Sequence, residues 1–280
     1  MREIQTDSIT EAVKDMCIAI NYTLSEDMTA ALQDAMRKEV SPLGRQVLGQ
    51  LQENLVIAEQ ERIPICQDTG MAVVFLEIGQ EVHVTGGSLE EAVQEGVRRG
   101  YEEGYLRKSV VGDPLLRVNT KDNTPAIVYY SIVPGERFRI TVTAKGFGSE
   151  NMSRIFMLKP AQGIEGVKEA VLETVREAGP NSCPPVVVGV GIGGTFEKAA
   201  LLAKQALLRP AAEKAEAPHI RELEEELLER INRFGIGPAG LGGRVTALAV
   251  HINTYATHIA GLPVAVNMCC HADRHAVREL

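Results

Sequence analysis

The stretch RIPICQDTG, residues 62–70, places a thiol directly beside an amide and a carboxylate, in Cys66, Gln67 and Asp68. A turn at Thr69-Gly70 ends the stretch, and the apolar run MAVVFLEI follows at once. A cysteine that only packs behaves as a small hydrophobe, whereas a reactive or metal-binding cysteine lies among polar groups. The spacing therefore indicates a functional thiol at the mouth of a strand, with partners elsewhere in the chain.

Two further cysteine segments have a similar setting. Cys183, in AGPNSCPPVVV, comes just before a predicted buried strand, and the neighbouring prolines make its turn rigid. Cys269 and Cys270 follow the apolar run PVAVNM. Because adjacent residues of a strand point to opposite faces, one of this pair can face a site while the other packs. Packing thiols are the alternative for each segment, and Cys17, on the apolar stripe of a predicted helix, is expected to be structural.

Three thiolates at three strand-end turns are one fewer than the usual four cysteine ligands of a [4Fe–4S] cluster. A cluster held by three cysteines would keep an open position on its fourth iron. Such an iron is a Lewis acid, able to take a substrate hydroxyl and carboxylate. Asp68 would then hold or protonate the hydroxyl as it leaves. The chain has no CxxC pair, so the pattern does not favour a zinc ribbon.

Other segments have features typical of anion binding. Lys145 begins KGFGSE, a glycine-containing loop after a predicted strand, and Arg107 follows a predicted helix. A turn that needs positive φ explains Gly146 or Gly148 equally well, and a solvated surface position explains Arg107. His258 lies between two late predicted strands, where a purely structural histidine is the alternative.

The segment GVGIGGTFEKAALL resembles a dinucleotide-binding turn, in which a strand runs into glycines and then into a helix. That fingerprint also needs a second strand that ends in an acidic residue about 20 residues beyond the glycines. The sequence there is LLRPAAEKAEAPH, which is not a strand pattern. A nicotinamide-dependent oxidoreductase that uses the Gly191 loop is therefore an alternative from another functional class.

Composition is that of an ordinary globular chain of 280 residues, 45% hydrophobic and 24% charged. A formal net charge of −8 argues against a general nucleic-acid or anionic-membrane surface. No apolar run approaches the roughly 20 residues that span a bilayer, and the N-terminus has no signal-peptide core. We therefore expect a cytoplasmic protein, in which the five cysteines are thiols or ligands rather than disulfides.

Periodicity predicts a mixed α/β (α+β) fold. Residues 8–60 have helical spacing, and residues 71–145 contain short β-branched strands interrupted by a helix over 88–104, with Ser88 as its N-cap. Helices are predicted over 164–178, 195–208 and 218–234, and strands over 184–194, 244–252 and 262–268. We predict a helical N-terminal segment, residues 1–60, packed on a mixed-sheet body with flanking helices, residues 61–280.

Five segments, in this order and spacing, make the chain resemble one known family: PICQDTG, LRKSVVGDPL, NTPAIVYYSIVPGERFRITVTAKGFGSENMSR, NSCPPVVVGVGIGGTFEKA and THIAGLPVAVNMCCHADRH. The chain resembles, over nearly its whole length, the alpha subunit of the class I iron–sulfur hydro-lyases, the family of two-subunit fumarate hydratase and L-tartrate dehydratase. The resemblance implies a [4Fe–4S] cluster with Cys66 and Cys183 as two ligands and Cys270 as the third. The doubled cysteine leaves Cys269 open as the third ligand instead.

The same resemblance implies roles for five other residues. Gln67 and Asp68 would contact the substrate beside the cluster, Arg107 would bind a substrate carboxylate, Gly148 would offer a backbone contact to substrate, and His258 would be an active-site histidine.

The resemblance also implies a reaction and a partner. The reaction would be the reversible dehydration of malate to fumarate, a step of the tricarboxylic acid cycle, with L-tartrate dehydration as the alternative. The catalytic base would come from a beta subunit, so we expect a hetero-oligomer, α2β2, that is inactive as the alpha chain alone. An exposed iron would make the cluster sensitive to oxygen. A non-catalytic scaffold with packing cysteines is the competing hypothesis, and it predicts a colourless protein.

Overall fold

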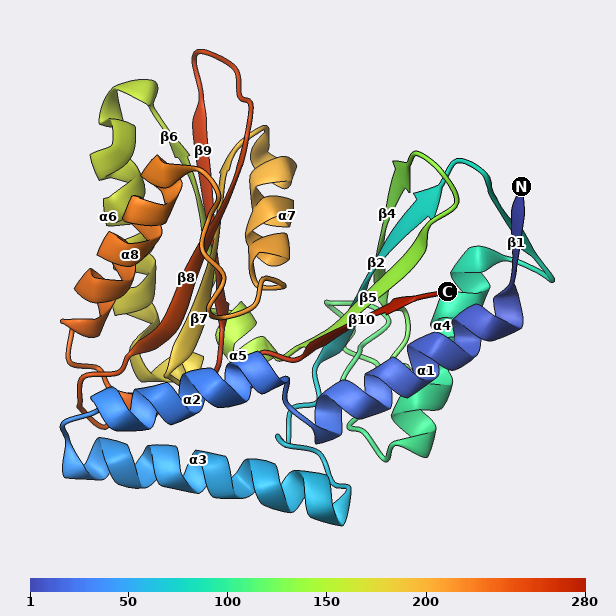
Figure 1. The fold of residues 1–280 in the computed structure, drawn as a ribbon, viewed down its shortest axis with the longest axis horizontal. Helices are drawn as coiled ribbons and strands as arrows, with labels where there is room; N and C mark the ends of the chain where they lie inside the picture. The colour runs from blue at the N-terminus through green and yellow to red at the C-terminus, as the bar shows by residue number, and fades with distance from the viewer. The chain divides into compact units, whose positions relative to one another are not determined.

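The computed structural model describes residues 1–280, which form two compact units. Unit 1 comprises Met1–Ser25, Leu55–Gly146 and Arg274–Leu280, and unit 2 comprises Glu26–Asn54 and Phe147–Asp273. Both units contain helices and sheets, so the predicted mixed α/β class is confirmed (Figure 1). Residues 1–60 contribute to both units, and the predicted division into 1–60 and 61–280 stays a prediction.

Unit 1 is built on a four-stranded sheet in the order β10-β5-β2-β4. Strand β2 pairs in parallel with β4 and antiparallel with β5, and β5 pairs antiparallel with β10. A smaller parallel pair, β1-β3, completes the strands of this unit. Their bounds are β1 (Arg2–Gln5), β2 (Met71–Gly79), β3 (Val82–Thr85), β4 (Ile127–Val133), β5 (Phe138–Lys145) and β10 (His275–Glu279).

Helices α1 (Thr6–Tyr22) and α4 (Leu89–Glu103) share one hydrophobic core with β2 and β5. They approach closely because α4 carries glycines on the shared face: a Cβ at Gly96 would lie 2.7 Å from the Thr10 carbonyl oxygen. Cys17 belongs to this core, is 1% exposed, and has its thiol pKa raised to about 12 by burial. The predicted N-cap of α4 is confirmed, since Ser88 Oγ accepts the Glu91 N–H.

Unit 2 is built on a second four-stranded sheet in the order β6-β9-β7-β8, in which β7 and β8 are parallel and the other pairs antiparallel. Helices α6 (Gly163–Ala178) and α8 (Pro218–Asn232) lie on one side of it and α7 (Phe196–Ala206) on the other (Figure 1). The strand bounds are β6 (Arg154–Leu158), β7 (Val186–Gly193), β8 (Ala247–Tyr255) and β9 (Leu262–Cys269).

Short elements connect these layers. Helix α5 (Phe147–Glu150) and the 3-10 turns η1 (Pro160–Gln162), η2 (Gly179–Ser182) and η3 (Pro238–Gly240) all belong to unit 2. Helix α2 (Glu26–Lys38) also belongs to unit 2, whereas α3 (Pro42–Glu61) continues through the boundary between the units.

Three strands escaped the sequence analysis: β1, β6 and β10. Strands β6 and β10 are edge strands of five residues each, and short edge strands have a weak alternation signal because only one neighbour and one face constrain them. No helix in the structure combines the length and the apolar composition that crossing a membrane requires.

Candidate active site

The Cys66 turn of unit 1 is joined to the segment that carries Arg107. Thr69 Oγ1 donates a hydrogen bond to the Arg107 carbonyl oxygen at 3.1 Å. Cys66 and Asp68 are partly exposed, whereas Gln67 and Arg107 are exposed. The structure therefore brings the backbone of Arg107 against the turn that carries Cys66, Gln67 and Asp68, within unit 1.

Two buried side chains fix this arrangement. The hydroxyl of Tyr101 lies 2.8 Å from the Thr69 carbonyl oxygen, and burial raises its pKa, so it stays a donor. Asn123 is fully buried; its Nδ2 donates to the Gly70 carbonyl at 3.2 Å, and its Oδ1 accepts the Ser109 N–H at 2.7 Å. The side-chain amide of Asn123 thus binds both the turn that ends at Gly70 and the loop that contains Ser109.

Asp68 is oriented by its own turn and by an arginine from the end of the chain. Its Oδ1 accepts the Gly70 N–H at 2.9 Å, and its backbone carbonyl accepts from Arg274 Nη2 at 2.9 Å. Arg274 is 3% exposed and also donates to Asn21 Oδ1 at 3.0 Å. A Cβ at Gly146 would lie 3.2 Å from Asp68 Oδ2, so this glycine preserves the space beside the carboxylate.

Cys183 occupies a strained, exposed position in unit 2. It follows η2 in the left-handed region, at φ 55° and ψ 62°, and its N–H donates to the Pro180 carbonyl at 3.1 Å. A non-glycine residue in this region costs about 1 kcal/mol and persists only where the surroundings enforce it. The turn therefore holds this thiol outward at a definite point just before β7.

The two adjacent cysteines at the end of β9 differ in their surroundings. Cys269 is 3% exposed and its Sγ donates to Asp273 Oδ1 at 3.6 Å, whereas Cys270 is partly exposed. His271 Nδ1 lies 3.4 Å from the Cys183 carbonyl oxygen. The segment that carries Cys270 therefore lies against the Cys183 turn.

Gly148 is placed at this same end of the sheet of unit 2. It is exposed in α5, and a Cβ there would lie 4.0 Å from the Asn181 carbonyl oxygen, in the turn before Cys183. Glu150 fastens α5 to β9, because its Oε2 accepts from Asn267 Nδ2 at 2.6 Å. Gly148, Cys183 and Cys270 thus come from three segments that meet at one end of the sheet.

His258 lies at the opposite end of that sheet. It is exposed in the β8–β9 connection, beyond Tyr255, which pairs with Gly193, the last residue of β7. Figure 1 shows this connection and α5 at opposite ends of the strands. Since Cys183 precedes β7, the length of that strand, about 23 Å at 3.3 Å per residue, separates the two regions. Within this chain, His258 does not join Cys183 and Cys270.

The glycines of the Gly191 loop allow close packing in this structure. A Cβ at Gly191 would lie 2.0 Å from the Ala199 carbonyl oxygen, so glycine allows α7 to lie directly on β7. The N-terminus of α7 already holds a carboxylate of the chain, since Thr195 Oγ1 donates to Glu197 Oε1 at 2.5 Å. This hydroxyl and the N–H of Glu197 itself lower the pKa of the Glu197 carboxyl. The Glu197 carboxylate therefore already takes up donors at this helix terminus that a pyrophosphate would use.

The candidate cysteine ligands divide between the two units. Cys66 belongs to unit 1, and Cys183 and Cys270 belong to unit 2. Within neither unit do three His, Cys, Asp or Glu side chains gather as a metal site. None of the three thiols is in a disulfide and each is at least partly exposed. Their donor chemistry and accessibility fit the thiolate ligands that an iron–sulfur cluster needs.

Sequence reasoning missed the residues that orient the site. Asn123, Tyr101 and Arg274 were assigned no role, although Asn123 lies in the quoted segment that begins NTP and Arg274 in the segment that ends HADRH. The sequence could have drawn attention to an asparagine or arginine inside such a segment. That these side chains are buried, and so orient the site, becomes known only from the fold.

Comparison with known proteins gives one consistent result. A model of the family described as fumarate hydratase (fumerase) matches residues 10–279. A Methanocaldococcus jannaschii protein provisionally named L(+)-tartrate dehydratase subunit alpha is 44% identical over 278 residues, 97% of each chain. The L(+)-tartrate dehydratase subunit alpha of Escherichia coli K12 is 33% identical over 272 residues, which cover 96% of this chain and 89% of that protein.

Proposed function

The chain belongs to the fumarate hydratase family and is a hydro-lyase, and from this premise we propose that it is the cluster-binding alpha subunit of a two-subunit enzyme. The enzyme dehydrates a 2-hydroxy dicarboxylate, and the reaction depends on an iron–sulfur cluster. The observation that carries the proposal is Cys183, an exposed thiol in a left-handed turn, beside the segment of Cys270.

Cys66, Cys183 and Cys270 would hold the [4Fe–4S] cluster. When bound, a cluster with one iron not held by cysteine supplies a Lewis acid for the departing hydroxyl. The burial of Cys269 and its hydrogen bond to Asp273 support Cys270 as the third ligand. A thiolate ligand must be deprotonated and accessible, and Cys270 is the more accessible of the pair.

The substrate-binding residues of unit 1 act by position and charge. Arg107 binds one substrate carboxylate, since a guanidinium matches a carboxylate with two parallel hydrogen bonds. Gln67 donates its amide hydrogens to the substrate from the same unit. Asp68 holds the proton for the departing hydroxyl on its carboxyl group, which the Gly70 N–H orients through Oδ1.

Gly148 and His258 complete the set that the resemblance implies, both from unit 2. Gly148 offers its backbone to the substrate at the cysteine end of the sheet. His258 stays a predicted active-site residue, and its place at the opposite end means that its role needs a separate test.

Dehydration also needs a base that removes the proton from the carbon next to the hydroxyl-bearing carbon. We propose that this base comes from a beta subunit in a hetero-oligomer, which agrees with the words "subunit alpha" in the names of the relatives. The holo alpha chain alone would then turn over neither malate nor fumarate.

Two compounds are candidates for the substrate, and both would react by the same mechanism. Malate is the 2-hydroxy dicarboxylate whose dehydration gives fumarate, and the family description supports it. L(+)-tartrate is favoured by the names of the relatives, which cover nearly the whole chain. Both substrates carry two carboxylates and at least one hydroxyl beside a carboxylate, so Arg107 and Asp68 would serve either.

The test is iron and acid-labile sulfide per chain after anaerobic reconstitution, followed by assays with the beta subunit on S-malate and on L-tartrate. About four of each per chain, with hydration or dehydration only in the assembled enzyme, is the expected result. A chain that binds no iron, or one that converts either substrate unaided, would contradict the proposal.

A further inference from the structure

A fully buried carboxylate lies at the end of α2, far in sequence from every residue of the candidate site. Glu39 is 0% exposed. Its Oε1 accepts the N–H groups of Val40 and Ser41, both at 2.8 Å. Its Oε2 accepts the N–H groups of Arg244 at 2.9 Å and Val245 at 2.8 Å. Four backbone donors from two loops thus converge on one side chain.

The surroundings of Glu39 fit an ionised carboxylate. Burial alone would raise its pKa, but the backbone N–H groups outweigh burial and hold the pKa of the carboxyl below its ordinary value. Such a concave set of backbone donors is a typical anion-binding nest. Two glycines leave room for it: a Cβ would lie 2.9 Å from the Glu39 side chain at Gly44 and 2.8 Å from it at Gly243.

The loop that Glu39 holds, residues 237–246, reaches the Cys183 turn from both sides. The Ala239 N–H donates to the Pro184 carbonyl at 2.8 Å, directly after Cys183. On the other side, a Cβ at Gly240 would lie 2.3 Å from Cβ of Pro180, the residue whose carbonyl accepts the Cys183 N–H. The left-handed Cys183 is therefore clamped by a loop whose far end is tied to Glu39.

We propose that Glu39 is a positioning residue for the Cys183 thiol, acting through the 237–246 loop. This inference rests on the proposed function, since it concerns one ligand of the proposed cluster. Loss of the carboxylate would release the Arg244 and Val245 end of the loop. The turn around Cys183 would then lose the support that enforces its strained backbone.

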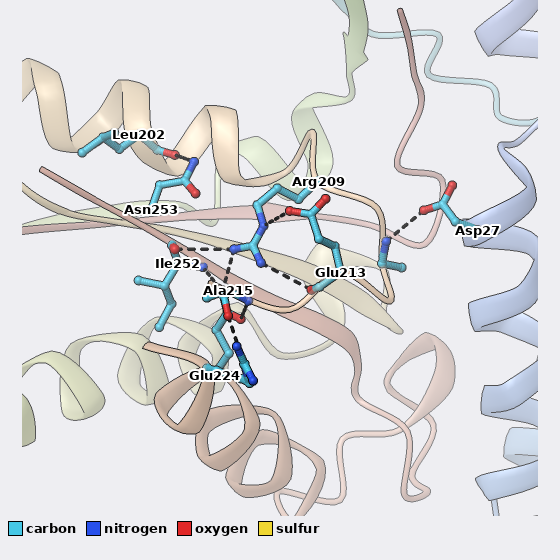
Figure 2. Close-up of polar contacts among 10 residues, drawn as sticks. Asp27, Leu202, Arg209, Glu213, Ala215, Glu224, Ile252 and Asn253 are labelled. Atoms are coloured by element: carbon cyan, nitrogen blue, oxygen red, sulfur yellow. Dashed lines mark hydrogen bonds and ion pairs between the residues drawn. The ribbon is translucent and has the colours of Figure 1, made fainter. Parts of the chain in front are cut away.

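A second buried carboxylate of unit 2 provides a matched control. Glu224 is 5% exposed, and its Oε1 accepts from Arg209 Nη1 at 2.6 Å and from the Ile252 N–H at 2.8 Å, while Oε2 accepts the Ala215 N–H at 3.0 Å. Figure 2 shows this network, which fastens the loop after α7 to β8 and α8. Glu224 supports the same unit but touches no part of the Cys183 turn.

The experiment compares Glu39→Gln with Glu224→Gln in the full-length chain. Each protein is reconstituted anaerobically, and iron release to a ferrous chelator is timed, with urea unfolding measured alongside. Supporting groups around metal ligands are worth about 10- to 100-fold in metal affinity. We expect Glu39→Gln to release iron about tenfold faster than wild type, and Glu224→Gln to release it at the wild-type rate despite a similar loss of stability.

Two further measurements strengthen the test: one does not depend on the folding of Glu39→Gln, and the other does not depend on iron. Gly240→Ala leaves the nest intact but pushes the loop away from Pro180, and it should reproduce the faster iron release. In the apo chain, alkylation by iodoacetamide is followed by mass spectrometry at Cys183 and at Cys66. Either variant should change the rate at Cys183 relative to Cys66, because a loosened turn no longer holds the exposed Sγ in one fixed environment.

The outcomes separate the two proposals. If wild type binds no iron, the proposed function fails, and the alkylation ratio still tests the positioning role. If wild type binds iron but Glu39→Gln and Gly240→Ala behave as Glu224→Gln does in both measurements, the positioning role is wrong while the cluster stands.

Discussion

The two ends of the sheet of unit 2 use similar sequence features for different purposes. At the β7 start, prolines and glycines hold the Cys183 turn in a strained conformation that directs a thiol outward. At the β7 end, the glycines let α7 pack on the strand, and nearby charges are satisfied internally: Glu197 binds Thr195, and Lys198 Nζ lies 4.7 Å from the centre of the Tyr255 ring.

This difference shows that a glycine-rich turn has no fixed meaning. The same residue type allows close packing at Gly191 and lies against the Cys183 turn at Gly240, and only the atoms around each glycine distinguish the two. At a candidate site, a strained backbone directs a reactive side chain outward. At a packing glycine, a neighbouring backbone atom occupies the space that a Cβ would need.

The largest loss of iron should come from a substitution at the start of β7, where Cys183 lies. Cys183→Ser removes a proposed thiolate ligand, so iron per chain after anaerobic reconstitution should fall from about four to near zero. Iron and acid-labile sulfide assays measure this directly. Wild-type iron content in the variant would show that the exposed thiol is not a ligand.

The adjacent cysteines Cys269 and Cys270 provide a sharper contrast, because they are neighbours in sequence but differ in exposure. Cys270→Ser should lose most of its iron, whereas Cys269→Ser, which changes a buried thiol that donates to Asp273, should retain it. The assay is again iron per chain. The reverse result would assign the third ligand to Cys269.

Gly191→Ala should destabilise the packing of α7 on β7 without changing the iron content per chain. The new Cβ would collide with the Ala199 backbone oxygen at 2.0 Å, so α7 must shift, at a cost of about 3 kcal/mol in the free energy of unfolding. Urea unfolding measures it. Gly49→Ala is the control, since its Cβ meets Met36 at an ordinary 3.5 Å and alanine should stabilise α3 by about 0.5–1 kcal/mol. Equal effects of the two variants would refute the packing role.

His251, in the middle of β8, should make the stability of unit 2 depend on pH. It is 1% exposed, neither ring nitrogen has a hydrogen-bond partner, and burial, with the nearby Arg209, lowers its pKa to about 4, although Glu213 and Asp27 oppose this shift. Because the unfolded chain takes up the proton first, stability is full above pH 6.5 and falls as pH drops toward 4.

The loss approaches about 1.4 kcal/mol per pH unit below pH 6.5 and amounts to about 1.5 kcal/mol between pH 6.5 and 5. Urea unfolding of the apo chain at these two pH values measures it. His251→Leu should remove most of the dependence. An unchanged slope in that variant would assign the effect to other groups.

The smallest effect on iron should come from His258→Ala, because His258 lies at the end of the sheet away from Cys183. Iron per chain should equal that of wild type. The turnover number of the assembled enzyme then tests the predicted active-site role on its own, and unchanged turnover would remove His258 from the site.

The sequence by itself determined the family, the mixed α/β class, most helices and central strands, and the residues with chemical potential. These depend on local spacing and on motifs such as PICQDTG and NSCPP, which remain visible without a fold. Helical periodicity and apolar strand runs are likewise local signals, which explains why the weak edge strands β6 and β10 were missed.

Only the tertiary structure decided which neighbours these residues have. It buried Cys269 and left Cys270 accessible, placed His258 at the far end from Cys183, and filled the space beside Gly191 with a helix backbone. It also brought Glu39 to a loop some 200 positions away in sequence, through hydrogen bonds to Arg244 and Val245. Burial and contact between distant segments arise from packing, and no local pattern of side chains encodes them.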